Sequence, residues 1–423
     1  MDELEGKEFD MPLDDTAPGL DALLLGTALE LELSDRDHRV TEKRYQLIPE
    51  HLQRPASRLR PYMDNARVYA QGSRAIGATI IDGATDDRFD LDAILEFRRP
   101  RGWSISDVLD ELFTAFQGFP DVQEIERCTR CIQLKFAFMH LDVTPMDPHG
   151  EPRPLRSGVV YHSPDDGDDQ LFPANPYGFA DWFQQQVARP SRAFRDHVTA
   201  MRANMGIEDR LATNSIMADA DIDALPAPRN PLRDAPQVIA LKLMKRYLNL
   251  RYAKRSLKRP ISIYLSKIAA LVPPNENGLC AQLESYALDL EHRVHTSMVT
   301  GIPLDEKNPA PPQEDFNDRW PASSEDLRVF RDDLQHLVAE LERARSSNFT
   351  DVRKIFDELF GERVSEKAVR SYLESHRGLS IPRAFEPAKG FVAAPALLTP
   401  AAAKAAPTSK APAHHFHSGR LPK

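Results

Sequence analysis

The sequence predicts an α+β protein with a mixed β-sheet, a helical lobe and a disordered tail. Short segments with alternating apolar residues, typical of strands, gather between residues 66 and 146. Longer segments with apolar residues at helical spacing follow them. After Pro382 the chain is rich in Ala, Pro and Lys, which bury too little apolar surface to offset the entropy of ordering. We divide the chain into a flexible N-terminus (1–17), a core with a long N-terminal helix (18–170), a helical lobe (171–380) and a disordered tail (381–423).

Composition excludes several classes of protein. A chain of 423 residues is long enough for two lobes around a large core. Its net charge is −10, whereas proteins that track long nucleic acids carry a basic patch, so we expect no such partner. The acidic N-terminus and the lack of a long apolar run predict a soluble, cytoplasmic protein without a membrane contact.

The three cysteines indicate a reducing compartment. Cys128 and Cys131 have the spacing of half a zinc site, but no second pair completes four ligands. We therefore expect ordinary thiols on a strand.

The N-terminal part of the core has helical composition. Apolar residues begin at Leu20, and charged residues continue to about Gln53. This pattern predicts one or two long helices, broken near Pro49 or Pro55.

A short apolar strand at residues 68–70 leads into Gly72 and Ser73. Glycine lets the backbone approach a phosphate group closely. Ser73, at the start of a helix, offers a hydroxyl beside free N–H groups. This turn is a candidate phosphate-binding site.

Two carboxylates follow on the next predicted strand. Asp90 and Asp92 are separated by one residue, so they project from the same face of the strand. The loop acids Asp86 and Asp87 are assigned to solvent, because Gly and Thr flank them. Adjacent carboxylates repel each other unless a cation compensates, and hard oxygen ligands favour Mg²⁺ or Mn²⁺.

A helix at residues 104–117, capped by Ser104 or Ser106, separates this strand from a further one at residues 132–141. Asp142 ends the latter strand and is the third candidate acid. Three acids can hold two metal ions roughly 3.5–4 Å apart, the arrangement that clamps the attacking and leaving oxygens in phosphoryl transfer. Each signal alone is weak, but their order along the chain is specific.

Further helices are predicted towards the C-terminus. Residues 177–188 place Phe179, Trp182 and Phe183 between the lobes, and 237–252 forms a helix on which Lys242 and Arg246 are either solvated or functional. Helices at 323–345 and 351–375 begin with Ser323 or Ser324 and with Thr350 as caps.

Two charged segments lie outside these helices. The basic cluster at 251–259 either attracts anions or is a solvated loop. The acidic run at 165–169 lacks an EF-hand register, and we expect a mobile surface loop near the mouth of the site.

These motifs resemble the polymerase-beta-like nucleotidyltransferases, and within them the bacterial enzymes related to cyclic GMP-AMP synthase, the CD-NTase family. The matching catalytic motifs are Gln-Gly-Ser-Arg-Ala-Ile-Gly at 71–77, Asp-Leu-Asp at 90–92 and Leu-Asp-Val-Thr-Pro at 141–145. Segments typical of this subgroup lie at 175–183, 243–247, 260–262 and 317–320. The resemblance extends over roughly residues 20–345.

The resemblance implies a polymerase-beta-like lobe joined by a long helix to the helical lobe. It implies an enzyme that uses two Mg²⁺ ions, or Mn²⁺, to condense nucleoside triphosphates into a cyclic di- or trinucleotide messenger for anti-phage defence. The implied catalytic and metal-binding residues are Asp90, Asp92 and Asp142, and the implied nucleotide-binding residues are Gln71, Gly72, Ser73, Lys245 and Ser262. The implied partners are an effector protein that responds to the product and a conjugation or regulatory partner at the C-terminal tail.

Two other functions are compatible with these residues. One is template-independent addition of nucleotides to RNA or to a protein hydroxyl, which requires a macromolecular acceptor. The other is a non-catalytic nucleotide-binding module, although such a module has no need for mutually repelling carboxylates.

Overall fold

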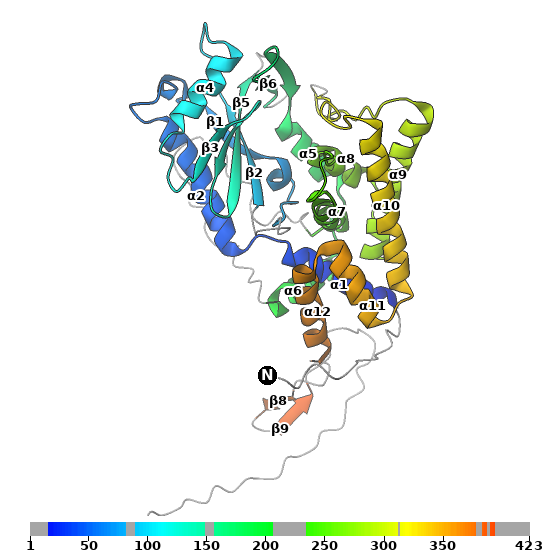
Figure 1. Ribbon diagram of the computed structural model, residues 1–423. Coiled ribbons are helices and arrows are strands. Elements are labelled where there is room, and N and C mark those ends of the chain that lie inside the picture. Colours follow the sequence, from blue (N-terminus) through cyan, green and yellow to red (C-terminus); the bar gives the residue numbers. More distant parts are fainter. Residues whose placement is uncertain are drawn as a thin grey trace, which may run out of the picture.

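The computed structural model describes residues 16–81, 89–148, 156–205, 234–311, 314–377, 383–386 and 390–393. It confirms the predicted α+β class, with a mixed sheet on one side and a helical lobe on the other (Figure 1). Residues 1–15 and most of 381–423 lie outside the described part. Within the predicted tail, only the paired strands β8 (Arg383–Glu386) and β9 (Gly390–Ala393) are described. Conjugation of the tail stays a prediction.

A seven-stranded sheet forms the first lobe, with five strands in the order β1-β2-β5-β4-β3. Neighbouring strands are antiparallel, except that β2 and β5 are parallel. The far end of β5 pairs with β6, which pairs with β7. The strands are β1 (Arg67–Gln71), β2 (Phe89–Glu96), β3 (Glu124–Arg127), β4 (Ile132–Lys135), β5 (Met139–Pro148), β6 (Gly158–His162) and β7 (Gln170–Ala174).

One face of this sheet is covered by α2 (Asp35–Leu52) and α4 (Ile105–Ala115) (Figure 1). The core between them contains the odd-numbered residues of β2 from Phe89 to Leu95, which alternate with residues on the other face. As predicted, Ser104 caps α4, and it does so in a capping box with Asp107. The opposite face is directed towards the helical lobe.

Of the one or two long helices predicted for this segment, the structure has two, α1 (Thr16–Glu30) and α2, which ends at Leu52 before Pro55. The break between them was not predicted; it falls at residues 31–34 because Ser34 and Asp37 form a capping box that starts α2. Pro49 is accommodated near the end of α2. The apolar residues of α1 pack in the core of the helical lobe rather than on the sheet.

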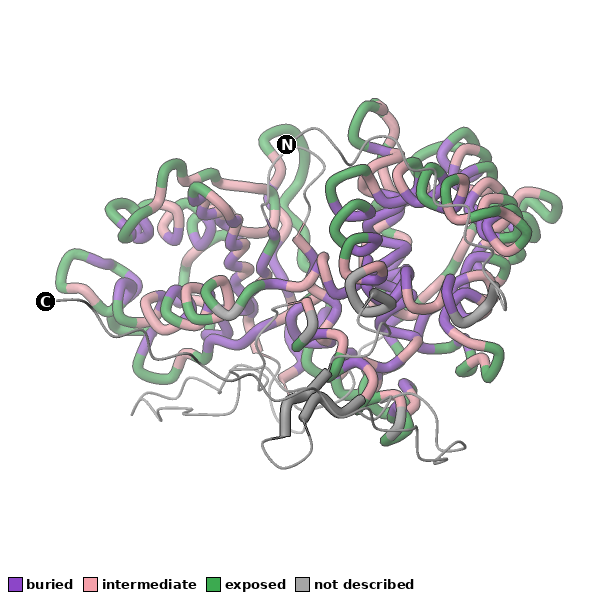
Figure 2. The backbone as a smooth tube through the Cα atoms, turned by 90° about the horizontal axis from the view of Figure 1, so that it is seen from below, coloured by how far each residue is buried: buried purple, intermediate pink, exposed green. Residues whose placement is uncertain are grey.

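The helical lobe is arranged around α7 (Pro236–Tyr252), in which every residue from Gln237 to Leu248 is buried. Figure 2 shows buried residues inside both lobes. Of the two alternatives for Lys242 and Arg246, solvation is excluded, because both side chains are buried: Lys242 pairs with Glu32, and Arg246 donates to the backbone oxygen of Phe360. The remaining helices are α5 (Pro176–Gln186), α6 (Arg192–Asn204), α8 (Ser262–Leu271), α9 (Leu279–Thr300), α10 (Ser324–Arg345), α11 (Phe349–Phe360) and α12 (Glu362–Arg377).

The helix predicted at 351–375 is two helices, divided at Gly361. This residue has φ +88°, and a Cβ there would lie 2.8 Å from Nη2 of Arg246, so only glycine fits. Asn348, rather than Thr350, caps α11. Ser323 caps α10 as predicted.

Candidate active site

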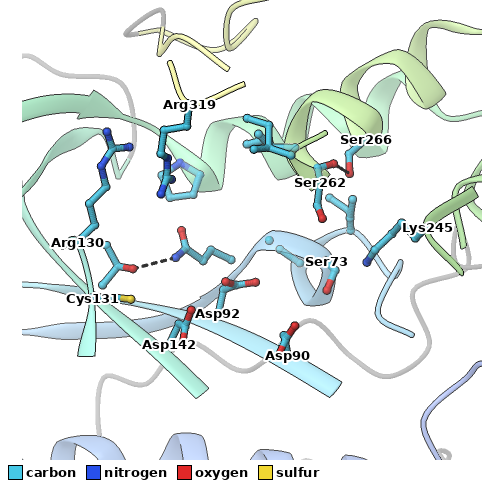
Figure 3. A pocket seen from close by; sticks show the side chains of 18 of the residues that line it. Ser73, Asp90, Asp92, Arg130, Cys131, Asp142, Lys245, Ser262, Ser266 and Arg319 are labelled. Carbon is cyan, nitrogen blue, oxygen red and sulfur yellow. Dashed lines mark hydrogen bonds between the residues drawn. The ribbon is translucent and has the colours of Figure 1, made fainter. Parts of the chain in front are cut away.

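A cleft of about 930 Å³ separates the open face of the sheet from α5, α7 and α8 (Figure 3). Residues from both lobes line it, although they are far apart in sequence. All of the predicted site residues are among them: Gln71, Gly72, Ser73, Asp90, Asp92, Asp142, Lys245 and Ser262.

The sheet register places two of the acids next to each other. Asp92 on β2 is paired with Asp142 on the parallel strand β5, and neighbouring strands are about 4.8 Å apart. Asp90 lies two residues earlier on the same face of β2. From the covered face, the Tyr45 hydroxyl donates to the backbone oxygen of Asp92 at 2.6 Å. The positions of the acids are therefore fixed by regular strand geometry.

The electrostatics of these acids are unusual. Burial, together with the charges of Asp142 and Asp90, raises the pKa of Asp92 from 3.8 to about 7, although Lys245 opposes this shift. Burial also raises the pKa of Asp142, although Nε2 of Gln133 donates to its Oδ1 at 2.9 Å. Near neutral pH, these carboxylates resist carrying their charges together.

Asp90 has a different environment. Its side chain is 74% exposed, and its Oδ1 lies 3.3 Å from Nδ1 of His140. It contributes to the negative potential of the cleft without being enclosed in it.

Gly72 is required by close packing against the acids. Its φ is +59°, and a Cβ at this position would lie 2.2 Å from Oδ2 of Asp92. Any side chain would therefore displace that carboxylate. The backbone at Gly72 enters α3 (Gly72–Ala75), so Ser73 lies at the edge of the cleft.

Ser73 and Lys245 lie together at one end of the cleft (Figure 3). The Ser73 hydroxyl is 3.2 Å from that of Thr79. Nζ of Lys245 donates to the backbone oxygen of Ala78 at 3.0 Å, which ties α7 to the loop after α3. A hydroxyl and an ammonium group beside a glycine turn are suited to binding phosphate oxygens.

The remaining two predicted residues lie on different walls. Nε2 of Gln71 donates to the Thr144 hydroxyl at 3.3 Å, next to the acids. Ser262 begins α8 on the opposite wall, and Nη2 of Arg259 donates to its hydroxyl at 3.2 Å. Of the basic cluster at 251–259, Arg259 lines the cleft, whereas Arg251 and Arg255 form ion pairs with Asp333.

The acids fit a divalent cation in their chemistry. Asp90, Asp92 and Asp142 provide hard oxygen ligands, and a cation would relieve the repulsion that raises the pKa of Asp92. In the part of the chain that the structure describes, no three His, Cys, Asp or Glu side chains are grouped closely enough to form a metal site as they stand. Asp90 is exposed and projects from the same face of β2 as Asp92.

Sequence reasoning missed several residues that line the cleft. Arg130 and Cys131 belong to the turn between β3 and β4, where the N–H of Cys128 donates to the oxygen of Cys131 at 2.9 Å. The two cysteines thus flank a turn instead of lying within a strand. Arg319 comes from the loop before α10 and belongs to the motif at 317–320, which was the signal that could have identified it.

None of the helices in the described ranges is long and apolar enough to cross a membrane.

Comparison with known proteins identifies relatives over most of the chain. No family model matches it. The cyclic dinucleotide synthase CdnG of Bradyrhizobium diazoefficiens is 30% identical over 369 residues, which cover 86% of this chain and 85% of the relative. The structure of that CD-NTase in complex with GTP has a TM-score of 0.70, covering 84% of this chain and 98% of the other.

A more distant structure supports the fold alone. CdnC of E. coli MS115-1, in its complex with HORMA-deltaN, has a TM-score of 0.53 at 13% identity, covering 81% of this chain and 98% of that one. The extent and identity of the match to CdnG confirm the resemblance predicted from the motifs. The chain belongs to the CD-NTase family.

Proposed function

We propose that this chain is a cyclic oligonucleotide synthase, which condenses nucleoside triphosphates into a cyclic di- or trinucleotide and releases pyrophosphate. The observation that carries the proposal is the pairing of Asp92 with Asp142 beside the Gly72 turn. The relative named as a cyclic dinucleotide synthase, solved with GTP, supports it.

The donor nucleotide would bind with its phosphates at the end of the cleft formed by Ser73 and Lys245. The hydroxyl, the ammonium group and the N–H groups after Gly72 would hold the β- and γ-phosphates. Ser262 and Gln71 line the same cleft and would contact the nucleotide. Positioning of the reactants contributes much of the rate enhancement in phosphoryl transfer.

The accepting ribose hydroxyl would lie at the acids. Asp90, Asp92 and Asp142 would hold two Mg²⁺ or Mn²⁺ ions, whose chemistry at such a site is to neutralise phosphate charge and to lower the pKa of an attacking hydroxyl. Asp142, held by Gln133, would orient the acceptor side of the site. A second transfer at the same acids would close the ring.

The test is product analysis. Purified protein is incubated with all four nucleoside triphosphates and Mg²⁺ or Mn²⁺, treated with phosphatase, and analysed by mass spectrometry. We expect a phosphatase-resistant cyclic product whose mass gives its bases and ring size. Only linear, phosphatase-sensitive products, or none, would refute cyclic synthesis.

Addition of nucleotides to RNA or to a protein hydroxyl is the alternative. It predicts that no product forms until a macromolecular acceptor is added, and that label from the nucleotide then migrates with that acceptor. The net charge of −10 disfavours the RNA version.

We propose further that the product acts in the cytoplasm on an effector protein during phage infection. The family resemblance supports this role. Bacteria that express the chain are infected with phage, and the nucleotide is measured in extracts, with Asp90→Asn/Asp92→Asn as the control. Infection should raise the product only in cells with the wild-type chain, and a level that infection does not change would contradict the role.

A further inference from the structure

The cleft has a second cationic end. Arg130, from the turn between β3 and β4, and Arg319, from the loop before α10, lie across the acids from Ser73 and Lys245 (Figure 3). Neither arginine has a role in the proposed transfer reaction. Each comes from a different lobe, so they meet only in the folded chain.

Arg130 is held rigidly. Its Nη2 donates to Oδ2 of Asp318 at 2.7 Å, and its Nε donates to Nδ1 of His162 at 3.2 Å. Its guanidinium carbon lies 4.2 Å from the centre of the Phe172 ring, and only 15% of its side chain is exposed. The ion pair with Asp318 therefore links the sheet lobe to the helical lobe at the mouth of the cleft.

Arg319 is held differently, because 57% of its side chain is exposed and it points into the cleft (Figure 3). Its Nε is 3.7 Å from Oδ1 of Asp318, the carboxylate that already bonds to Arg130. Two guanidinium groups thus share this carboxylate.

The surrounding carboxylates cancel only part of the positive charge, because the single carboxylate of Asp318 faces two guanidinium groups. Glu314 also lines this region, but burial raises its pKa to about 7, so it is only partly ionised at neutral pH. Burial and the charges of Arg130 and Arg319 lower the pKa of His162, as expected in a positive field. An anionic ligand would relieve the repulsion between the guanidinium groups of Arg130 and Arg319, whereas the edge of a neutral nucleobase would not.

We propose that Arg319, positioned by the Arg130–Asp318 pair, binds the 5′-phosphates of the nucleotide that accepts the transfer. The inference rests on the proposed function, since it requires two nucleotides in one cleft. With the donor phosphates at Ser73 and the reacting hydroxyl at the acids, the other nucleotide extends towards Arg319. The planar guanidinium matches two phosphate oxygens at once.

The test separates donor from acceptor. A 2′,3′-dideoxynucleoside triphosphate, which can only donate, is combined with an acceptor supplied as the triphosphate or as the unphosphorylated nucleoside. Arg319→Gln should weaken the apparent affinity for the triphosphate acceptor roughly tenfold, the loss of one charge-assisted contact. It should leave the KM for the nucleoside acceptor and for the donor unchanged. The control Arg328→Gln, at an exposed position of α10, should change none of these values. Equal losses for both acceptors, or no loss, would overturn the inference.

Binding without turnover distinguishes this inference from the proposed function. We expect wild-type protein to bind two α,β-methylene nucleoside triphosphates per chain, and Arg319→Gln to bind one with wild-type affinity and the other roughly tenfold more weakly. If the wild type binds two but makes no linked product, the synthase proposal fails while the arginine site stands. If the variant also binds two with unchanged affinities, the arginine site fails.

The role of Arg130 and Asp318 as positioning residues is tested by a charge swap. Arg130→Asp and Asp318→Arg should each reproduce the loss of triphosphate affinity. The double variant, which restores an ion pair between the lobes, should recover at least part of it. No recovery in a folded double variant would contradict the positioning role.

Discussion

Comparing two of the charged clusters in the described part of the chain shows that they differ in the balance of their charges. The hinge cluster, next to the link between α1 and α2, contains Glu32, Arg202, Asp234 and Lys242. Arg202 bonds to Glu32 at 2.9 Å and to Asp234 at 2.5 Å, and Lys242 bonds to Glu32 at 2.7 Å. Two positive groups therefore face two negative ones.

The acid cluster of Asp90, Asp92 and Asp142 has no such balance. Asp92 and Asp142 are register partners, and Lys245, the cation that lowers the pKa of Asp92, donates to a backbone oxygen. Burying like charges together is unfavourable, so the fold is less stable for it. The comparison teaches that balanced charge ties the α1–α2 link to α6 and α7, whereas unbalanced charge lies at the proposed reaction site.

Removing negative charges from the acid cluster should have the largest effect on activity. Asp90→Asn with Asp92→Asn should lower product formation by roughly a thousandfold or more, since the developing phosphate charge loses its support. The fold should be retained, as judged by circular dichroism. Substantial activity in a folded double variant would refute the assignment of the acid cluster.

Removing a positive charge from the hinge cluster should lower the stability of the fold rather than the activity. Arg202→Met leaves Glu32 and Asp234 with one cation, so the free energy of unfolding should fall by about 3 kcal/mol. Urea denaturation measures this change, with Arg328→Gln on the surface as a control that should remain within about 0.5 kcal/mol of wild type. A loss in Arg202→Met as small as that of the control would show that the hinge cluster does not stabilise the fold.

The raised pKa of Asp92 predicts that metal binding at the acid cluster depends on pH. Below pH 7 a cation must displace the proton on this carboxyl, so affinity for Mn²⁺ should rise by up to roughly tenfold per pH unit and level off above about pH 7. Calorimetric titration at pH 6, 7 and 8 provides the measurement. Constant affinity over this range would contradict the raised pKa.

The smallest expected effect concerns the phosphate end. Ser73→Ala removes one hydroxyl donor but leaves the backbone N–H groups, so turnover should fall by about tenfold or less. Steady-state kinetics with saturating metal measures it. An unchanged rate would exclude Ser73 from phosphate binding.

Local rules were sufficient to predict the acid cluster but not the hinge cluster. Strand periodicity placed Asp90 and Asp92 on one face, and the order of motifs singled out Asp142. The burial of Lys242 could not be read from α7, because its partner Glu32 is 210 residues away in the sequence. The sequence shows that α7 carries basic residues, but only the tertiary packing determines which side chains surround Lys242 and Arg246.

Other errors had signals in the sequence. The capping box of Ser34 and Asp37 signals the start of α2 and hence the break after α1. Gly361 signals the division of the last predicted helix into two. Arg319 lay in a motif that was noted, yet only the fold brings it to Arg130. Sequence therefore identified the acids more readily than the long-range contacts that complete the cleft.

The central claim is that Asp92 and Asp142 are held together at the expense of stability, and unfolding measurements on Asp92→Asn without divalent cations test it most directly. Because folding raises the pKa of Asp92 from 3.8 to about 7, the folded chain binds the proton more tightly between these values, and wild-type stability is lost as pH rises through them. We expect the variant to match wild type near pH 4 and to be more stable by about 4 kcal/mol at pH 8, since each unit of the pKa shift corresponds to about 1.4 kcal/mol. A variant that is less stable than wild type at pH 8 would contradict the account.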